Sequence, residues 1–172
     1  MGPVTGGRFV CLDDPFDVDA FRYRLHPGAA KNMVGLTVSP RSGVRTMAAD
    51  GARLILEDAT LKQGQRFQFA WNFMTWGDMP WNDFALFEAK PTAMGAYGIS
   101  TVLYDLAELA HANKRTTGWR IGTWIAASDF AGTLEWTVAN GQAMTDPAIL
   151  QPDPVAFTNP AALLIDAIRV FG

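Results

Sequence analysis

The stretch that decides the fold reads QRFQFAWNF at residues 65–73 and continues as MTWGDMPWNDFALF at residues 74–87. Its aromatic residues stand at the alternate positions 67, 69, 71 and 73, separated by small or polar residues. Because successive side chains of a strand point to opposite faces, this run predicts a strand with a continuous aromatic face. Gly77 and Pro80 then interrupt the run, and a second apolar segment begins at Phe84. We interpret the pattern as two strands joined by a polar, aromatic-rich loop, which is typical of an all-β sandwich.

Size and composition favour one folded domain. The chain has 172 residues, of which 49% are hydrophobic and 18% charged. We expect residues 1–7 to be a tag or linker and residues 8–172 to form a single domain. The net charge of −3 argues against a nucleic-acid partner, which requires a clustered basic surface. No apolar run approaches the roughly 20 residues of a membrane span or resembles a secretory leader. Cys11 is the single cysteine, so no intrachain disulfide is expected.

The remaining strands are predicted to be short and separated by turn-forming residues, as in a jelly-roll β-sandwich. Asp105–Asn113 is the one helical segment, with Asp105 as its N-cap. Lys62–Gln65 forms a turn in which Gly64 takes a positive φ. Residues 140–160 form a long irregular loop containing four prolines, and loops of this length are often functional. The expected strands span residues 8–12, 20–25, 33–39, 53–56, 66–75, 84–88, 101–105, 119–125, 132–139 and 161–171.

Five motifs, in order along residues 58–171, carry a resemblance to a known family. They are RFQFAWNF at 66–73, PWNDFA at 80–85, TGW at 117–119, GTLEWTVAN at 132–140 and ALLIDAIRV at 162–170. This part of the chain resembles a recurring jelly-roll module of large bacterial surface proteins, including repeats-in-toxin adhesins and cell-wall-sorted exoproteins. The resemblance implies a calcium-bound jelly roll, related in fold to many carbohydrate-binding modules, at the cell surface or outside the cell. One departure is the loop before the last strand, which is long and proline-rich here instead of short and acidic.

Two carboxylates are candidate calcium ligands. Asp166 lies inside the final, largely apolar strand, and Asp83 stands at the head of its strand beside Asn82. A carboxylate in apolar surroundings is costly to desolvate unless it is paired or bound to a metal. Calcium prefers such oxygen ligands, so Asn82, Asp83 and Asp166 form the predicted metal set. The alternative is that the two carboxylates cap strand ends or pair with arginines such as Arg66 or Arg169.

Other titratable residues point away from catalysis. Asp13, Asp14, Asp17 and Asp19 lack the spacing of an EF-hand loop, so we interpret this segment as a solvated loop. His26 and His111 stand far apart, and each is interpreted as a surface or loop residue. No nucleophile elbow and no phosphate-binding glycine loop is present. The sequence therefore predicts a protein that is not an enzyme.

The loop after the aromatic strand is the predicted ligand site. Trp76 and Trp81 offer aromatic surface for a sugar ring or a peptide, although Trp81 is alternatively packed into the core. We expect the loops 76–82 and 140–160 to share one end of the sandwich, so that Trp76, Asp78 and Asn140 border one concavity. The resulting hypothesis is a noncatalytic, calcium-stabilised module that binds a glycan or a peptide. The alternative is a structural or assembly module without a small ligand, such as a spacer or virion-type component.

Overall fold

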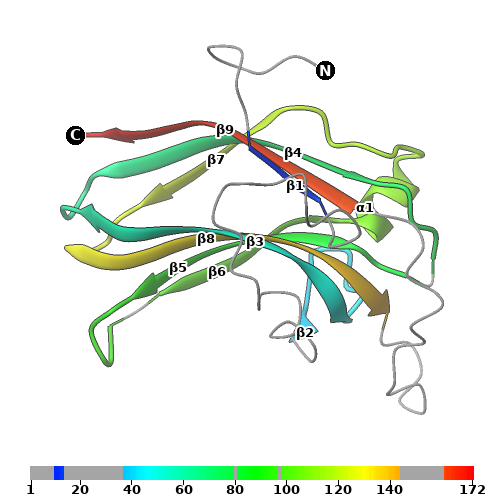
Figure 1. The fold of residues 1–172 in the computed structure, drawn as a ribbon, viewed down its shortest axis with the longest axis horizontal. Helices are drawn as coiled ribbons and strands as arrows, with labels where there is room; N and C mark the ends of the chain where they lie inside the picture. Colours follow the sequence, from blue (N-terminus) through cyan, green and yellow to red (C-terminus); the bar gives the residue numbers. More distant parts are fainter. Residues whose placement is uncertain (1–9, 14–36, 80, 97, 144–160) are drawn as a thin grey trace.

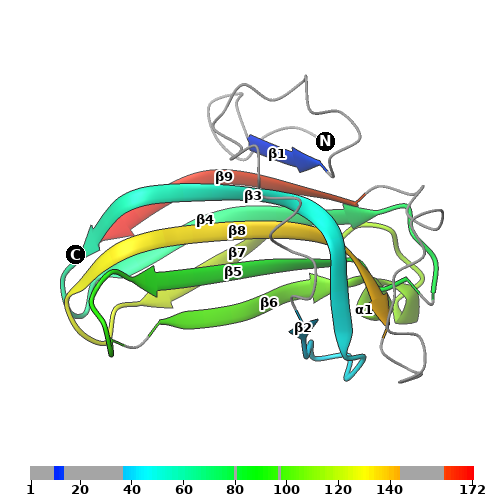
Figure 2. The ribbon, with the colours of Figure 1, turned by 60° about the horizontal axis from the view of Figure 1, so that its bottom comes forward.

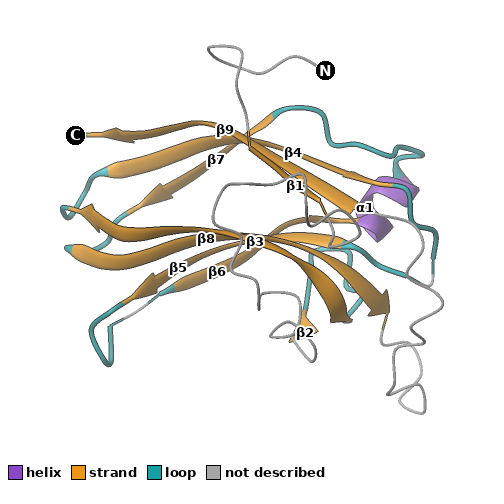
Figure 3. Cartoon of the chain, viewed as in Figure 1, coloured by secondary structure: helices purple, strands orange, loops and turns teal. Residues whose placement is uncertain are grey.

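The structure, a computed structural model, describes residues 10–13, 37–79, 81–96, 98–143 and 161–172. They form two antiparallel sheets packed face to face, with one short helix at one end (Figures 1 and 3). The predicted all-β sandwich with one short helix is therefore confirmed. The four-stranded sheet has the order β1 (Val10–Asp13), β9 (Ala161–Phe171), β4 (Arg66–Thr75), β7 (Arg120–Ile125). The five-stranded sheet has the order β2 (Thr37–Val38), β3 (Thr46–Leu61), β8 (Phe130–Ala143), β5 (Phe84–Pro91), β6 (Ile99–Asp105).

The strand pairings are nested, which is the topology of a jelly roll. β1 pairs with β9, β3 with β8, β4 with β7 and β5 with β6, all antiparallel. The chain thus resembles one long hairpin that is wrapped into two layers. The pairs β1–β9 and β4–β7 lie in one sheet, and the pairs β3–β8 and β5–β6 lie in the other. The extra strand β2 adds to β3 at the edge of the five-stranded sheet. α1 (Leu106–His111) connects β6 to the segment that leads into β7.

The aromatic face of β4 lies in the core, as its alternation predicts. All four of its aromatic side chains are 5% exposed or less. Phe67, Phe69 and Trp71 meet aromatic residues of the other sheet. The ring centroid of Phe69, for example, lies 4.8 Å from that of Phe87 and 5.3 Å from that of Trp136. Aromatic pairs at such distances contribute about 0.5–1.5 kcal/mol each beyond the burial of their area. This cluster joins the two sheets.

Local signals located several elements correctly. β4 and β9 have the predicted bounds, and the turn at Lys62–Gln65 is closed by a bond of 3.0 Å from the Gln65 N–H to the Lys62 carbonyl. Gly64 takes the expected positive φ of 84°. The predicted cap of α1 is also present, since the Asp105 carboxylate accepts from the Glu108 N–H at 3.0 Å.

β3 and β8 are much longer than predicted, and the predicted loop boundary at Asn140 is wrong. The two strands pair from Thr46 opposite Ala143 to Leu61 opposite Phe130, across two irregularities in register. Backbone hydrogen bonds from a long partner hold polar and glycine residues in strand geometry that their own propensity does not favour. Asn140 therefore lies inside β8. The strand predicted at 20–25, His26, the acidic residues 14–19 and most of the predicted loop 140–160 lie outside the described residues.

The sandwich has two ends and two lateral sides. α1 and the β4–β5 connection lie at one end, which we call the loop end. The turn at residues 62–65 and the connection from β7 to β8 lie at the other end. β6 and β7 are the outermost strands of their sheets on the same lateral side (Figure 2). Among the described residues, no helix is long and apolar enough to cross a membrane.

Candidate functional site

The β4–β5 connection, residues 76–83, carries the exposed apolar surface of the loop end. Trp76 is 51% exposed and Met79 is 45% exposed. Between them stands Asp78, whose side chain is 73% exposed. Large apolar side chains on a loop beside a charged group are typical of a recognition surface rather than of a core.

Hydrogen bonds at the base of the loop hold its first residues. The Thr75 hydroxyl donates to the Asp83 carboxylate, and the Gly77 N–H donates to the Thr75 hydroxyl at 2.9 Å. Gly77 is also packed tightly, because a Cβ there would lie 2.6 Å from an Asp83 carboxylate oxygen. Thr75, Gly77 and Asp83 are all buried, so these polar groups satisfy one another away from water.

Asn82 holds the other end of the loop through a buried polar network. Its side-chain nitrogen donates to the Thr46 hydroxyl at 2.7 Å and to the Asp105 carboxylate at 2.9 Å. Its side-chain oxygen accepts from the Ala107 N–H at 2.8 Å. The Ser42 hydroxyl also donates to Asp105, at 2.5 Å. Asn82 therefore ties the loop to β3, to the end of β6 and to the first turn of α1.

Arg115 bonds to the exposed part of the loop. Its guanidinium donates to the Gly77 carbonyl and forms an ion pair of 2.6 Å with Asp78. The Arg115 carbonyl in turn accepts from the Thr75 N–H at 3.0 Å. Beside this pair lies a cavity of about 190 Å³. It is lined by Asp78, Met79, Leu106, Ala110, Asn113, Lys114 and Arg115.

The structure brings only some of the predicted ligand residues to the surface of the loop end. Trp76 and Asp78 are exposed there, whereas Trp81 is half-buried. Asn140 is 1% exposed inside β8. The Asn82 N–H donates to the Gly141 carbonyl at 2.6 Å, so the β4–β5 connection contacts the end of β8. Residues 144–160 of the second predicted loop lie outside the described residues, and the shared end of the two loops stays a prediction. The cavity beside Asp78 is instead completed by α1 and Arg115.

The three predicted calcium ligands fall in two places. Asn82 and Asp83 are adjacent and buried at the loop end. Asp166 stands opposite Ala70, whereas Asp83 bonds to Thr75 at the end of β4. Five residues of strand separate these positions, which is roughly 17 Å. Within the described ranges, no group of three or more His, Cys, Asp or Glu residues is arranged to hold a metal ion.

The oxygens of Asn82 and Asp83 already have protein partners. The side-chain oxygen of Asn82 accepts from the Ala107 N–H, and one Asp83 carboxylate oxygen accepts from the Thr75 hydroxyl. The Asp166 carboxylate accepts from the N–H of Ala167, at 2.6 Å, where the strand bulges and Ala167 takes a φ of 51°. Asp83 therefore accepts from a side-chain hydroxyl at the end of β4, and Asp166 accepts from a backbone N–H inside β9. The calcium site stays a prediction.

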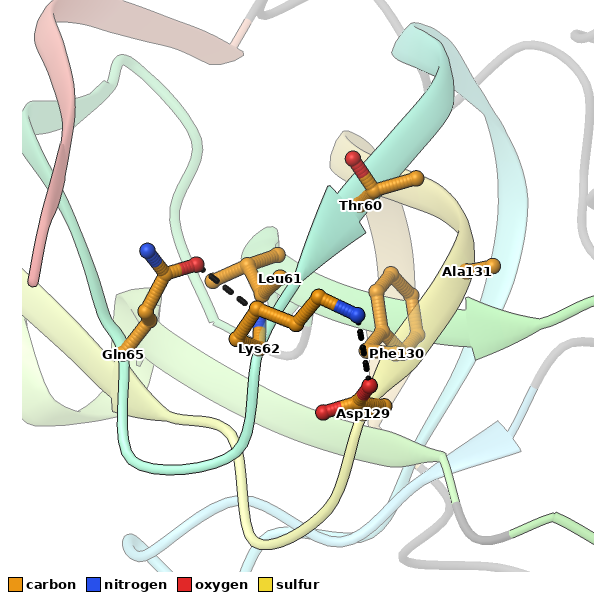
Figure 4. Close-up of a pocket in the computed structure, with 7 residues that line it drawn as sticks. All are labelled: Thr60, Leu61, Lys62, Gln65, Asp129, Phe130 and Ala131. Atoms are coloured by element: carbon orange, nitrogen blue, oxygen red, sulfur yellow. Dashed lines mark hydrogen bonds and ion pairs between the residues drawn. The ribbon is translucent and has the colours of Figure 1, made fainter.

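A second cavity, of about 290 Å³, lies beside the turn at residues 62–65, at the end of the sandwich opposite the loop end. Figure 4 shows the residues that line it. Lys62 and Asp129 form an ion pair of 2.8 Å across it, and the Gln63 N–H donates to Asp129 at 2.9 Å. These bonds raise the pKa of Lys62 and lower the pKa of Asp129. Both side chains are largely exposed, so solvent weakens the pair. We assign it to holding the turn at residues 62–65.

Sequence reasoning missed Arg115 and the network around Asp105. Arg115 stands after the helix in no recognisable motif, and its partners lie 37 and 38 residues earlier in the chain. Asp105 was recognised only as a helix cap. His111 is exposed, in agreement with its interpretation as a surface residue.

Comparisons with models of protein families and with curated protein sequences give no match.

Proposed function

We propose that this protein is a noncatalytic binding module that recognises a glycan or a peptide through its loop end. The observation that carries the proposal is the exposure of Trp76 on a loop whose two ends are fixed by buried polar bonds. A flexible loop folds its tryptophan back onto the protein at little cost. Here the backbone is tied to Thr75, Asn82 and Arg115, so the aromatic surface stays presented to solvent.

The energy available from Trp76 is sufficient for recognition. A tryptophan offers up to about 250 Å² of surface, and about half of it is accessible here. Covering about 125 Å² at about 25 cal/mol per Å² contributes about 3 kcal/mol, or somewhat more than a hundredfold in affinity. The Asp78–Arg115 pair contributes little to stability in so exposed a position. Its charged groups serve better to orient the hydroxyl or amide groups of a ligand.

The calcium and the extracellular or cell-surface location that the family resemblance implies belong to the same proposal. Their support is the jelly-roll topology together with the resemblance of residues 58–171. Asn82 and Asp83 are the adjacent candidate ligands, and calcium would share their oxygens with Ala107 and Thr75. Calcium bound there would stabilise the loop that carries Trp76.

Arrays of glycans and peptides test the proposal, with Trp76→Ala as the variant. We expect the wild-type protein to bind a defined class of array ligand and Trp76→Ala to lose about a hundredfold in affinity while keeping its thermal midpoint. Met94→Ala is the matched control, because Met94 is fully exposed in the β5–β6 connection at the opposite end. Equal binding by wild type and Trp76→Ala would refute the site.

The alternative, an assembly module, is favoured by exposed apolar residues of the four-stranded sheet. Ile121 and Ile125 of β7 are 58% and 59% exposed, and Val170 of β9 is 50% exposed. Sedimentation of the wild-type protein separates the two functions. Assembly is supported if the protein forms a stable oligomer that dissociates on substitution of Ile121 and Ile125, and if it binds no ligand on the glycan and peptide arrays. A monomer that binds array ligands supports recognition.

A further inference from the structure

A groove of about 290 Å³ is lined by residues of β6 and β7, which are edge strands of the two sheets. Its floor is formed by the core rings of Phe69, Trp71 and Phe87. Its two sides are formed by Ile99 and residues 101–103 of β6 and by residues 120–124 of β7, and Arg41 also lines it. The groove is separate from the cavity beside Asp78 and shares no lining residue with it.

On the β7 side of the groove, the packing against Phe69 requires a glycine at residue 122. Gly122 carries no side chain, and a Cβ there would lie 2.5 Å from the ring of Phe69. The ring of Phe69 is 1% exposed and is held by Phe87 and Trp136. The absence of a side chain at residue 122 leaves the space between the two edges unfilled at this point.

Both walls of the groove present unpaired strand edges. Among the described residues, β6 pairs with β5 alone and β7 with β4 alone. An unpaired edge offers a row of backbone N–H and C=O groups to any extended chain. Proteins normally protect such edges with charges, prolines or covering loops. β7 carries one charged residue, Arg120, and the apolar residues Ile121 and Ile125, which are both more than half exposed.

The charge at the groove is positive, although the whole chain has a net charge of −3. Arg41 and Arg120 line it, and no carboxylate is among its lining residues. Arg120 is held with its guanidinium 4.7 Å from the centre of the Tyr104 ring, which fixes the charge in place. Burial raises the pKa of Glu108 on α1, and the charges of the two arginines oppose that rise. Glu108 is not among the residues that line the groove.

We propose that the groove binds an extended acidic peptide segment, which adds as a strand to the edge of β7 and places carboxylates against Arg41 and Arg120. Backbone edges favour a peptide over a sugar, because main-chain hydrogen bonds are the basis of strand addition. The aromatic rings also disfavour a sugar. The ring of Tyr104 is covered by Arg120, and Trp124 packs edge-on against Phe130 at 4.9 Å.

The probe is a fluorescent peptide of about eight alternating valines and glutamates, the length of a common strand. We expect saturable binding in fluorescence anisotropy, and no binding of the matching valine–lysine peptide. The double variant Arg41→Gln, Arg120→Gln is expected to bind the acidic peptide about tenfold more weakly or worse. Arg45→Gln is the matched control, because Arg45 is an exposed arginine of the same β2–β3 connection outside the groove. Equal binding by the double variant and the wild type would overturn the proposal.

Methylated peptides test the strand pairing itself. N-methylation of alternate residues removes backbone donors from one edge of the peptide at a time. We expect one methylated series to lose binding and the other to keep it, since only one edge of an added strand faces β7. Equal binding of both series would exclude strand addition. Binding of polygalacturonate, but not of the acidic peptide, would show that the arginines serve an acidic glycan and would likewise overturn the proposal.

The groove and the loop end are distinguished by testing the variant of each site against the ligand of the other. Trp76→Ala is expected to leave binding of the acidic peptide unchanged, because Trp76 does not line the groove. The double arginine variant is expected to leave any array ligand of the loop end unchanged. Loss of peptide binding in Trp76→Ala would show that the two surfaces are one site and would refute the separate groove.

Discussion

Replacing Asn82 with alanine tests whether the buried network fixes the loop end. Asn82 is 0% exposed, and its side chain makes three hydrogen bonds, to Thr46, Asp105 and Ala107. The neutral bonds to Thr46 and Ala107 contribute about 1 kcal/mol each, and the bond to the Asp105 carboxylate about 2 kcal/mol. We therefore expect Asn82→Ala to lower the free energy of unfolding by about 4 kcal/mol, a large share of the stability of an ordinary domain.

Urea unfolding followed by tryptophan fluorescence measures this loss. With a denaturant slope of about 2 kcal/mol per molar urea, the midpoint is expected to fall by about 2 M. Gln63→Ala is the matched control, because its exposed amide donates a single bond of 3.1 Å to the Ala127 carbonyl. That variant is expected to stay within about 0.5 kcal/mol of the wild type. A midpoint for Asn82→Ala within the error of the control would show that the network does not hold the loop end.

Three further outcomes are expected. If Asn82 and Asp83 bind calcium, millimolar calcium raises the thermal midpoint relative to a chelator; an identical midpoint in both conditions would eliminate the metal. Because burial raises the pKa of Glu108, its ionised form disfavours the fold, and stability declines as the pH rises from the ordinary carboxyl pKa through the raised one. Glu108→Gln should therefore raise the thermal midpoint at neutral pH and leave it unchanged below about pH 4, and the opposite pH dependence would contradict this assignment. Gly122→Ala forces the buried ring of Phe69 to move and should cost about 1–3 kcal/mol in urea unfolding, whereas an unchanged midpoint would show that the groove tolerates a side chain there.

Several features of this protein were readable from neighbouring residues alone. The alternating aromatics of β4 predicted its bounds and its buried face, because side-chain alternation is a local property of an extended chain. The cap at Asp105 and the turn at Gly64 were predicted for the same reason, since each depends on the conformation of a few consecutive residues. The exposure of Trp76 followed from the break that Gly77 introduces after the strand.

The amino-acid sequence by itself determined the all-β class, the central strand and the position of the exposed loop, because these depend on short-range alternation and turn chemistry. Only the tertiary structure decided which distant residues meet. Ser42 and Asp105 are 63 positions apart and yet share a hydrogen bond, and Asp166 lies opposite Ala70 rather than beside Asp83. Register between strands is set by the pairing of whole strands and by the bulges within them, and a shift of one residue would turn every side chain to the other face. The groove between β6 and β7 depends in the same way on which strands become the edges of the two sheets.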